Sequence, residues 1–176
     1  MQEGELKMAK KKVSHANRGL KFEEKIEQQC MKYLINGQAV IHKVPTEWKV
    51  LRKYNPAKKR SEIFNAFPVS ESKFVDFIGI SKGLPIAIEA KETKELTRFP
   101  FDNIKETQLE FFKNWNKNDG KGFYLIRFSS HDKIFLVECE KMQNCINTIG
   151  RKSAPYDWFL ENTTEIEDLD FLKYII

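Results

Sequence analysis

Apolar side chains recur at every third or fourth position between Asn17 and Leu34, the spacing of one face of an α-helix. The sequence therefore predicts a first helix over this range. The next apolar stretch, from Ala39 to Val44, is short and rich in β-prone residues, and Pro45 closes it. A strand fits this stretch better than a helix.

The hydrophobic pattern is lost between Thr46 and Lys73. This part of the chain contains two prolines, a basic cluster and only a short apolar patch. A long irregular excursion within a compact domain is usually functional or disordered, and the positive charge favours a function here. We interpret about residues 48–72 as an insertion that stands outside the core.

From Phe74 onward the pattern returns. Two β-prone stretches, Phe74 to Ile80 and Leu84 to Lys91, are separated by a short loop that contains glycine, which is typical of an antiparallel hairpin. A helix is predicted next. Asp102 or Asn103 can cap its start, and it ends near Gly120.

Two further strands are predicted from Gly122 to Phe128 and from Lys133 to Val137, with a polar turn between them. A helix from about Glu140 to Ile149 follows, and a short amphipathic segment ends the chain. This order of elements predicts an α/β fold, a mixed sheet flanked by helices.

Charge is distributed unevenly along the 176 residues, which have a formal net charge of +5 and are enough for a single domain. A basic cluster lies between Trp48 and Arg60, and acidic residues crowd the C-terminus. A phosphate backbone would be attracted to the first region and repelled by the second. Residues 1–14 carry lysines and are interpreted as a flexible basic arm that precedes a domain at 15–176.

Several classes of protein are disfavoured by what the sequence lacks. The three cysteines form no Cys-x-x-Cys pair, so neither a disulfide framework nor a zinc site is indicated. No apolar run approaches the length of a membrane span, and the N-terminal residues lack the apolar core of a signal peptide. We therefore expect a cytosolic protein without membrane contact. A glycine-rich phosphate loop is missing too, which disfavours a nucleotide-driven enzyme.

A possible active centre begins with Glu89 and Lys91, which the period of a strand places on the same face. The preceding strand supplies Asp76 as a second carboxylate, and the hairpin would bring it near Glu89. Oxygen ligands of this kind suit Mg²⁺ or Mn²⁺, which would activate water, while Lys91 would hold that water or stabilise the transition state. Taken alone, however, Glu89 and Lys91 fit an ordinary surface pair better.

Gln108 changes that balance, because it interrupts the buried stripe of its helix and a buried amide needs a partner. Its oxygen would complete the metal shell directly or through water, or else bind a backbone group. Glu23 is a further acidic candidate for the centre, although an exposed helical glutamate is the commoner outcome. Arg18, at the start of the first helix, is free to reach a phosphate.

These residues occur in motifs that resemble the RecU Holliday-junction resolvases, within the PD-(D/E)xK nuclease superfamily. Five motifs stand in the family's order, and together they are specific. They are Asn17-Arg18-Gly19-Leu20 with Phe22-Glu23, Val75-Asp76 with Gly79, Glu89-Ala90-Lys91-Glu92-Thr93, Phe99-Pro100 with Asn103 and Gln108, and Gly150-Arg151-Lys152-Ser153.

The resemblance implies a restriction-endonuclease-like fold in which Asp76, Glu89 and Gln108 are magnesium ligands. Lys91 then corresponds to the lysine that stabilises the transition state, and the insertion to a stalk that enters the centre of a four-way junction. The residues expected to contact DNA are Arg18, Lys58, Lys59, Arg60, Arg151 and Lys152. There is one departure: the family carries a threonine at the position of Phe74, so that hydroxyl is missing here and metal affinity or water ordering should be altered.

The implied function is Mg²⁺-dependent resolution of Holliday junctions in DNA recombination and repair, by a crossover junction endodeoxyribonuclease. Two strands must be nicked symmetrically, which implies a homodimer, and a recombinase is a candidate partner. Phe64, Phe67, Trp158 and Phe159 are candidates for the dimer interface, although a monomer could bury some of them. A less selective DNA endonuclease and a non-catalytic junction-binding or recombinase-modulating protein are the alternatives, and Phe74 favours the second of these.

Overall fold

The core of the molecule is a mixed sheet whose strands run in the order β1-β4-β5-β7-β8-β10. The computed structural model describes residues 16–45, 48–68 and 74–176, with side chains in the first helix from Lys21 onward. Within this sheet β5 and β7 are parallel and the other neighbours are antiparallel. Its strands are β1 (Val40–Lys43), β4 (Phe77–Ser81), β5 (Leu84–Thr93), β7 (Lys121–Phe128), β8 (Lys133–Glu138) and β10 (Thr164–Ile166).

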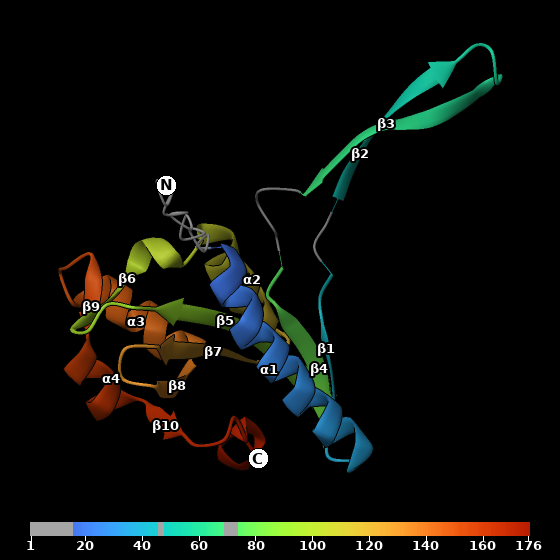
Figure 1. Cartoon of the computed structure of the whole chain (residues 1–176). Helices are drawn as coiled ribbons and strands as arrows, with labels where there is room; N and C mark the ends of the chain where they lie inside the picture. The colour runs from blue at the N-terminus through green and yellow to red at the C-terminus, as the bar shows by residue number, and fades with distance from the viewer. Residues whose placement is uncertain (1–15, 46–47, 69–73) are drawn as a thin grey trace, which may run out of the picture.

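Helices cover both faces of the sheet, and α1 lies across one face in Figure 1. Along β5, Ile86 and Ile88 pack into the cluster beneath α1, whereas Ala87 packs into the cluster on the opposite face. This alternation is the strand period that the sequence predicted, and the mixed sheet flanked by helices is confirmed. The helical elements are α1 (Ala16–Ile35), η1 (Phe101–Asn103), α2 (Glu106–Lys117), α3 (Cys139–Thr148), α4 (Tyr156–Asn162) and η2 (Phe171–Tyr174).

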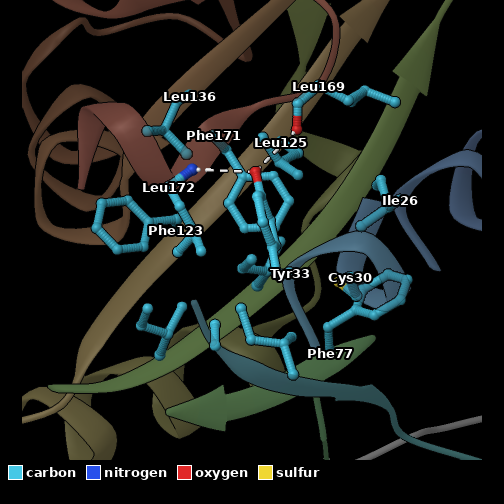
Figure 2. Packing of buried hydrophobic residues seen from close by; sticks show 14 of the residues in the cluster. Ile26, Cys30, Tyr33, Phe77, Phe123, Leu125, Leu136, Leu169, Phe171 and Leu172 are labelled. Carbon is cyan, nitrogen blue, oxygen red and sulfur yellow. Dashed lines mark hydrogen bonds between the residues drawn. The ribbon is translucent and has the colours of Figure 1, made fainter. Parts of the chain in front are cut away.

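The C-terminal segment is tied to α1 through the buried hydroxyl of Tyr33, as Figure 2 shows. This hydroxyl accepts a hydrogen bond from the Leu172 amide at 3.2 Å and lies 2.9 Å from Oδ1 of Asp170. The Tyr33 ring also meets the Phe171 ring edge-on. Because a buried hydroxyl needs such partners, these contacts close the core beneath η2 and fix the helix that carries Glu23.

A two-stranded hairpin formed by β2 (Trp48–Asn55) and β3 (Arg60–Pro68) projects from the body of the molecule (Figure 1). The strands pair antiparallel, with an irregularity between Leu51 and Arg52. The prediction of irregular structure was therefore wrong here. A free ribbon has no buried face, so its apolar and polar residues need not alternate, and periodicity gave no strand signal.

Other boundaries follow the predictions in part. The antiparallel pairs β4–β5 and β7–β8 are confirmed, as is the helix after β8. Asp102 and Asn103 do not cap α2 but lie in η1, and Lys105 is the residue before the first turn of α2. The short strands β6 (Arg98–Pro100), β9 (Ser153–Pro155) and β10 were missed, because three residues are too few to show a period.

Three sequence-based expectations concern the remainder of the chain. No helix in the described ranges is long and apolar enough to cross a membrane. Of the candidates for a dimer interface, Phe159 is wholly buried in the core, so the monomer itself buries it, whereas Phe64 on the hairpin is 71% exposed. The expected basic arm, residues 1–14, lies outside the described residues.

Candidate active site

Glu89 and Lys91 lie side by side on β5, between β4 and β7 in the middle of the sheet. The Lys91 ammonium is 2.7 Å from Oε1 of Glu89, and Glu89 is only 2% exposed. The pair is therefore not the ordinary surface contact that its sequence alone favours. A carboxylate taken out of water in this way needs compensating partners, because burial penalises its charged form.

Asp76 joins this pair from the residue before β4. Its Oδ2 accepts a hydrogen bond from the Ala90 amide at 2.8 Å, and its own carbonyl accepts one from Val44 at 2.7 Å. The side chain is therefore anchored to the strand that carries Glu89. The structure thus brings the two carboxylates together across adjacent strands, as the hairpin pattern led us to expect.

Burial and neighbouring negative charge perturb both carboxylates. Burial, followed by the charges of Glu89 and Glu23, raises the pKa of Asp76 from 3.8 to about 7. Burial likewise raises the pKa of Glu89, although the Lys91 ammonium acts in the opposite direction. A buried and a half-buried acid that oppose each other's ionisation attract a cation, and perturbed acids of this kind cluster at functional sites.

Gln108 links α2 to the centre. The prediction that it is buried is confirmed, since it is 4% exposed. Its Oε1 accepts a hydrogen bond from the Lys105 amide at 3.1 Å, as in a capping box, and its Nε2 donates to Oε1 of Glu89 at 2.5 Å. The amide oxygen thus binds a backbone group, the alternative to metal ligation, and a role for Gln108 as a metal ligand stays a prediction.

Oε2 of Glu89 is a buried carboxylate oxygen without a hydrogen-bond partner among the described residues, and a metal ion would fit it. Lys91 and Gln108 both contact Oε1, whereas Oε2 is buried and accepts no hydrogen bond from any described residue. An unpaired buried carboxylate oxygen is costly, and a divalent cation shared with Asp76 would satisfy it. The described residues contain no cluster of three or more His, Cys, Asp or Glu arranged for a metal. Two carboxylates suit Mg²⁺, which usually keeps several water ligands.

Glu23 lies on α1 and forms an ion pair with Lys43 of β1, with 2.8 Å between Oε2 and Nζ. The Glu23 side chain is 24% exposed, and its charge contributes to the raised pKa of Asp76. Sequence reasoning missed Lys43. The available signal was its place at the end of a short strand, because β1 pairs with β4 and Lys43 stands opposite Phe77, next to Asp76.

The residues expected to contact DNA are dispersed over the molecule. Lys58, Lys59 and Arg60 lie at the turn of the projecting hairpin, away from the carboxylates (Figure 1). Arg151 and Lys152 are exposed between α3 and β9. The side chain of Arg18 lies outside the described residues.

Sequence reasoning also missed an acid at the hairpin turn. Glu62 pairs with Lys58 at 2.9 Å and with Arg60 at 3.2 Å. It lies two residues after Arg60, so its place beside the basic cluster was visible in the sequence, but its pairing depended on the unpredicted hairpin.

Comparison with known proteins places this chain in a family. The sequence profile described as "RecU: Recombination protein U" matches residues 17–175. The chain belongs to the RecU family. An Oceanobacillus iheyensis relative named Holliday junction resolvase RecU is 34% identical over 163 residues, which cover 91% of this chain and 82% of the relative. A Staphylococcus epidermidis protein of the same name is 37% identical over 143 residues, covering 79% of this RecU-family chain and 68% of that relative.

Among solved structures, one similar chain is Archaeoglobus fulgidus Hjc, described as a Holliday junction resolvase from an archaeal hyperthermophile. The match covers 81% of this RecU-family chain and 94% of Hjc, with 12% identity and a TM-score of 0.47. No conclusion about this chain follows from so distant a likeness.

Proposed function

We propose that this RecU-family protein resolves four-way DNA junctions by Mg²⁺-dependent phosphodiester hydrolysis, with Asp76, Glu89 and Lys91 at the reacting centre. The observation that carries the proposal is the buried, unpaired Oε2 of Glu89 beside Asp76. Family membership supports junction resolution, since the relatives bear that name. Mn²⁺ would substitute, because it accepts the same oxygen ligands.

The chain's own residues divide the work of hydrolysis. Asp76 and Glu89 would hold the metal, which would supply an activated water and neutralise developing negative charge. Lys91 shares Oε1 of Glu89 with Gln108, which fixes the ammonium at the centre as a point charge for the transition state. Gln108 orients Glu89 and completes the start of α2, and Glu23 adds negative charge beside Asp76.

The proposed substrate also indicates an oligomeric state and a cellular process for this protein. A four-way junction presents two equivalent strands, so a two-fold homodimer would place one centre on each. Exposed apolar residues of the hairpin, including Trp48 and Phe64, are available for such an interface. The reaction belongs to DNA recombination and repair in the cytosol, where a recombinase is a candidate partner.

The decisive experiment incubates labelled junction, linear duplex and single strand with the protein, with and without Mg²⁺. We expect symmetric nicks in the junction only with Mg²⁺ or Mn²⁺. Lys91→Ala should cut about 10²-fold more slowly because it loses a charge that acts in the transition state. Lys94→Ala is the matched control, since Lys94 is exposed shortly after Lys91 and should cut normally.

Three results would overturn parts of the proposal. If the wild type binds junctions but never cuts them with either metal, the protein is a non-catalytic junction binder. Equal cutting of duplex and junction would leave a less selective endonuclease. Equal rates for Lys91→Ala and the wild type would remove Lys91 from the reaction.

A further inference from the structure

An aromatic ladder begins next to the candidate active site and follows the exposed side of α2. Phe74, two residues before Asp76, meets the Phe111 ring edge-on at 6.1 Å between centroids. Phe111 in turn stacks on Trp115 at 5.5 Å with an interplanar angle of 20°. Phe74 is 42% exposed and the other two rings are half-buried. Phe111 and Trp115, with the amide side chains of Asn114 and Asn118, line what we call the aromatic groove, and Phe74 adds a ring at its edge through Phe111.

The groove is hollow and its lining is mixed. It encloses about 600 Å³ and is bordered by the Phe111 and Trp115 rings, by Thr107 and Glu110, and by the two asparagines. Flat aromatic faces beside amide groups suit a planar ligand with hydrogen-bonding edges. The Glu110 carboxylate disfavours a phosphate in the same space. A nucleobase therefore fits this surface better than a DNA backbone.

Position along the helix connects the groove to the chemistry. Gln108, which contacts Glu89, precedes Phe111 by three residues, a rise of about 4.5 Å, and precedes Trp115 by about 10.5 Å. A DNA strand whose phosphate lies at the carboxylates would pass the groove within about three nucleotides, since bases are about 3.4 Å apart per strand. The groove thus lies on the same helix as the side chain that contacts Glu89.

We propose that the aromatic groove receives a nucleobase that flanks the scissile phosphate and is unstacked at the branch point of the junction. This inference rests on the proposed function and adds a source of structure selectivity to it. Taking a base out of its stack is least costly where pairing is already disturbed. In a linear duplex the full free energy of unstacking a base would oppose binding, whereas at the branch point much of that stacking is already lost. Stacking on the aromatic rings would therefore exceed the unstacking free energy only at a junction.

The test is a double-mutant cycle between protein and DNA. The cut site is first mapped on an intact junction, and a second junction then carries an abasic site at the nucleotide flanking that phosphate. Phe74→Leu and Phe111→Leu keep apolar bulk but remove a ring. Each should lower kcat/KM on the intact junction about tenfold and change it little on the abasic one. The wild type should lose about tenfold on the abasic junction.

Tyr174→Leu is the matched control, because it removes a 40% exposed ring from the C-terminal η2 and should cut both junctions like the wild type. If the Leu variants lose kcat/KM equally on intact and abasic junctions, or lose none on the intact one, the groove does not bind a base. If the wild type cuts no junction, the proposed function fails instead. Equilibrium binding of the two junctions in Ca²⁺ then still decides the groove, since Phe74→Leu must weaken only intact-junction binding about tenfold.

Discussion

At the scale of single residues, Asp76 gives the centre a defined response to pH. Its pKa is about 7 in the folded protein, against 3.8 as its ordinary value, chiefly because it is buried. The folded state therefore binds this proton more tightly than the unfolded chain does. The resulting stabilisation is complete below pH 3.8 and is lost as the pH rises through 7.

We expect the metal-free protein to lose unfolding free energy between about pH 4 and pH 7, and Asp76→Asn to show a shallower decline. Glu89 keeps part of the slope, because burial raises its pKa as well. Urea unfolding across this pH range in a chelator measures both variants. Asp102→Asn, at an exposed position in η1, is the control. The same slope in Asp76→Asn and wild type would contradict the role of Asp76.

Residue chemistry also marks the limit of what the sequence could predict at this site. The strand period placed Glu89 and Lys91 together, and the interrupted stripe of α2 correctly predicted a buried Gln108. The direction of the Gln108 amide could not be predicted, because it depends on where the Lys105 backbone amide lies at the start of α2. That position is set by η1, a three-residue helix that is too short to show a period in the sequence.

At the scale of elements, the β2–β3 hairpin carries its positive charge in a partly neutralised form. Glu62 accepts hydrogen bonds from Asn55 and Lys58, and its carboxylate also pairs with Arg60. These contacts lower the pKa of Glu62, so it stays ionised at neutral pH. Two of the three cations at the turn therefore share one anion before any DNA arrives.

Glu62→Gln should bind junctions several-fold more tightly at low salt. The amide oxygen can still accept from Asn55, while Lys58 and Arg60 become available to phosphates. The slope of log affinity against log salt should steepen by up to about 1 for each added phosphate contact. Titration at several salt concentrations measures this. Glu95→Gln, which breaks an exposed ion pair with Arg98 on the body, is the control. An unchanged slope would show that the hairpin turn does not contact the phosphates.

Elements also differ in how far their sequences predicted them. The strands β5 and β7 are buried along most of their length and α3 buries one side, so their burial left a run of β-prone apolar residues or a helical period in the sequence. The hairpin strands are exposed almost throughout, and a pairing that buries nothing leaves no such mark. The same exposure that hid the hairpin from sequence analysis leaves its basic turn open to a partner.

At the scale of the whole molecule, the body and the hairpin are separate structural units. The body has two hydrophobic clusters, one on each face of the sheet, and neither contains a residue of β2 or β3. The extensive contacts of β2 and β3 are with each other. Stability of the body and presentation of the hairpin are therefore set by different residues.

Replacing residues 48–68 by a short glycine-serine linker should leave the unfolding free energy of the body nearly unchanged, because no core contact is lost. Junction affinity should fall, since the basic turn goes with the hairpin. Chemical denaturation and junction binding, measured on the same preparation, separate the two effects. A large loss of stability, or undiminished binding, would contradict this division.

A ribbon that shares no core with its scaffold is also free to change independently of it. Mutations in β2 and β3 escape the packing constraints that hold the sheet, so their length and charge can vary without endangering the fold. Hairpins exchanged between relatives should thus carry their DNA preference with them. In evolutionary terms the hairpin can be replaced or can diverge, whereas selection must keep the packed residues of the catalytic body nearly unchanged.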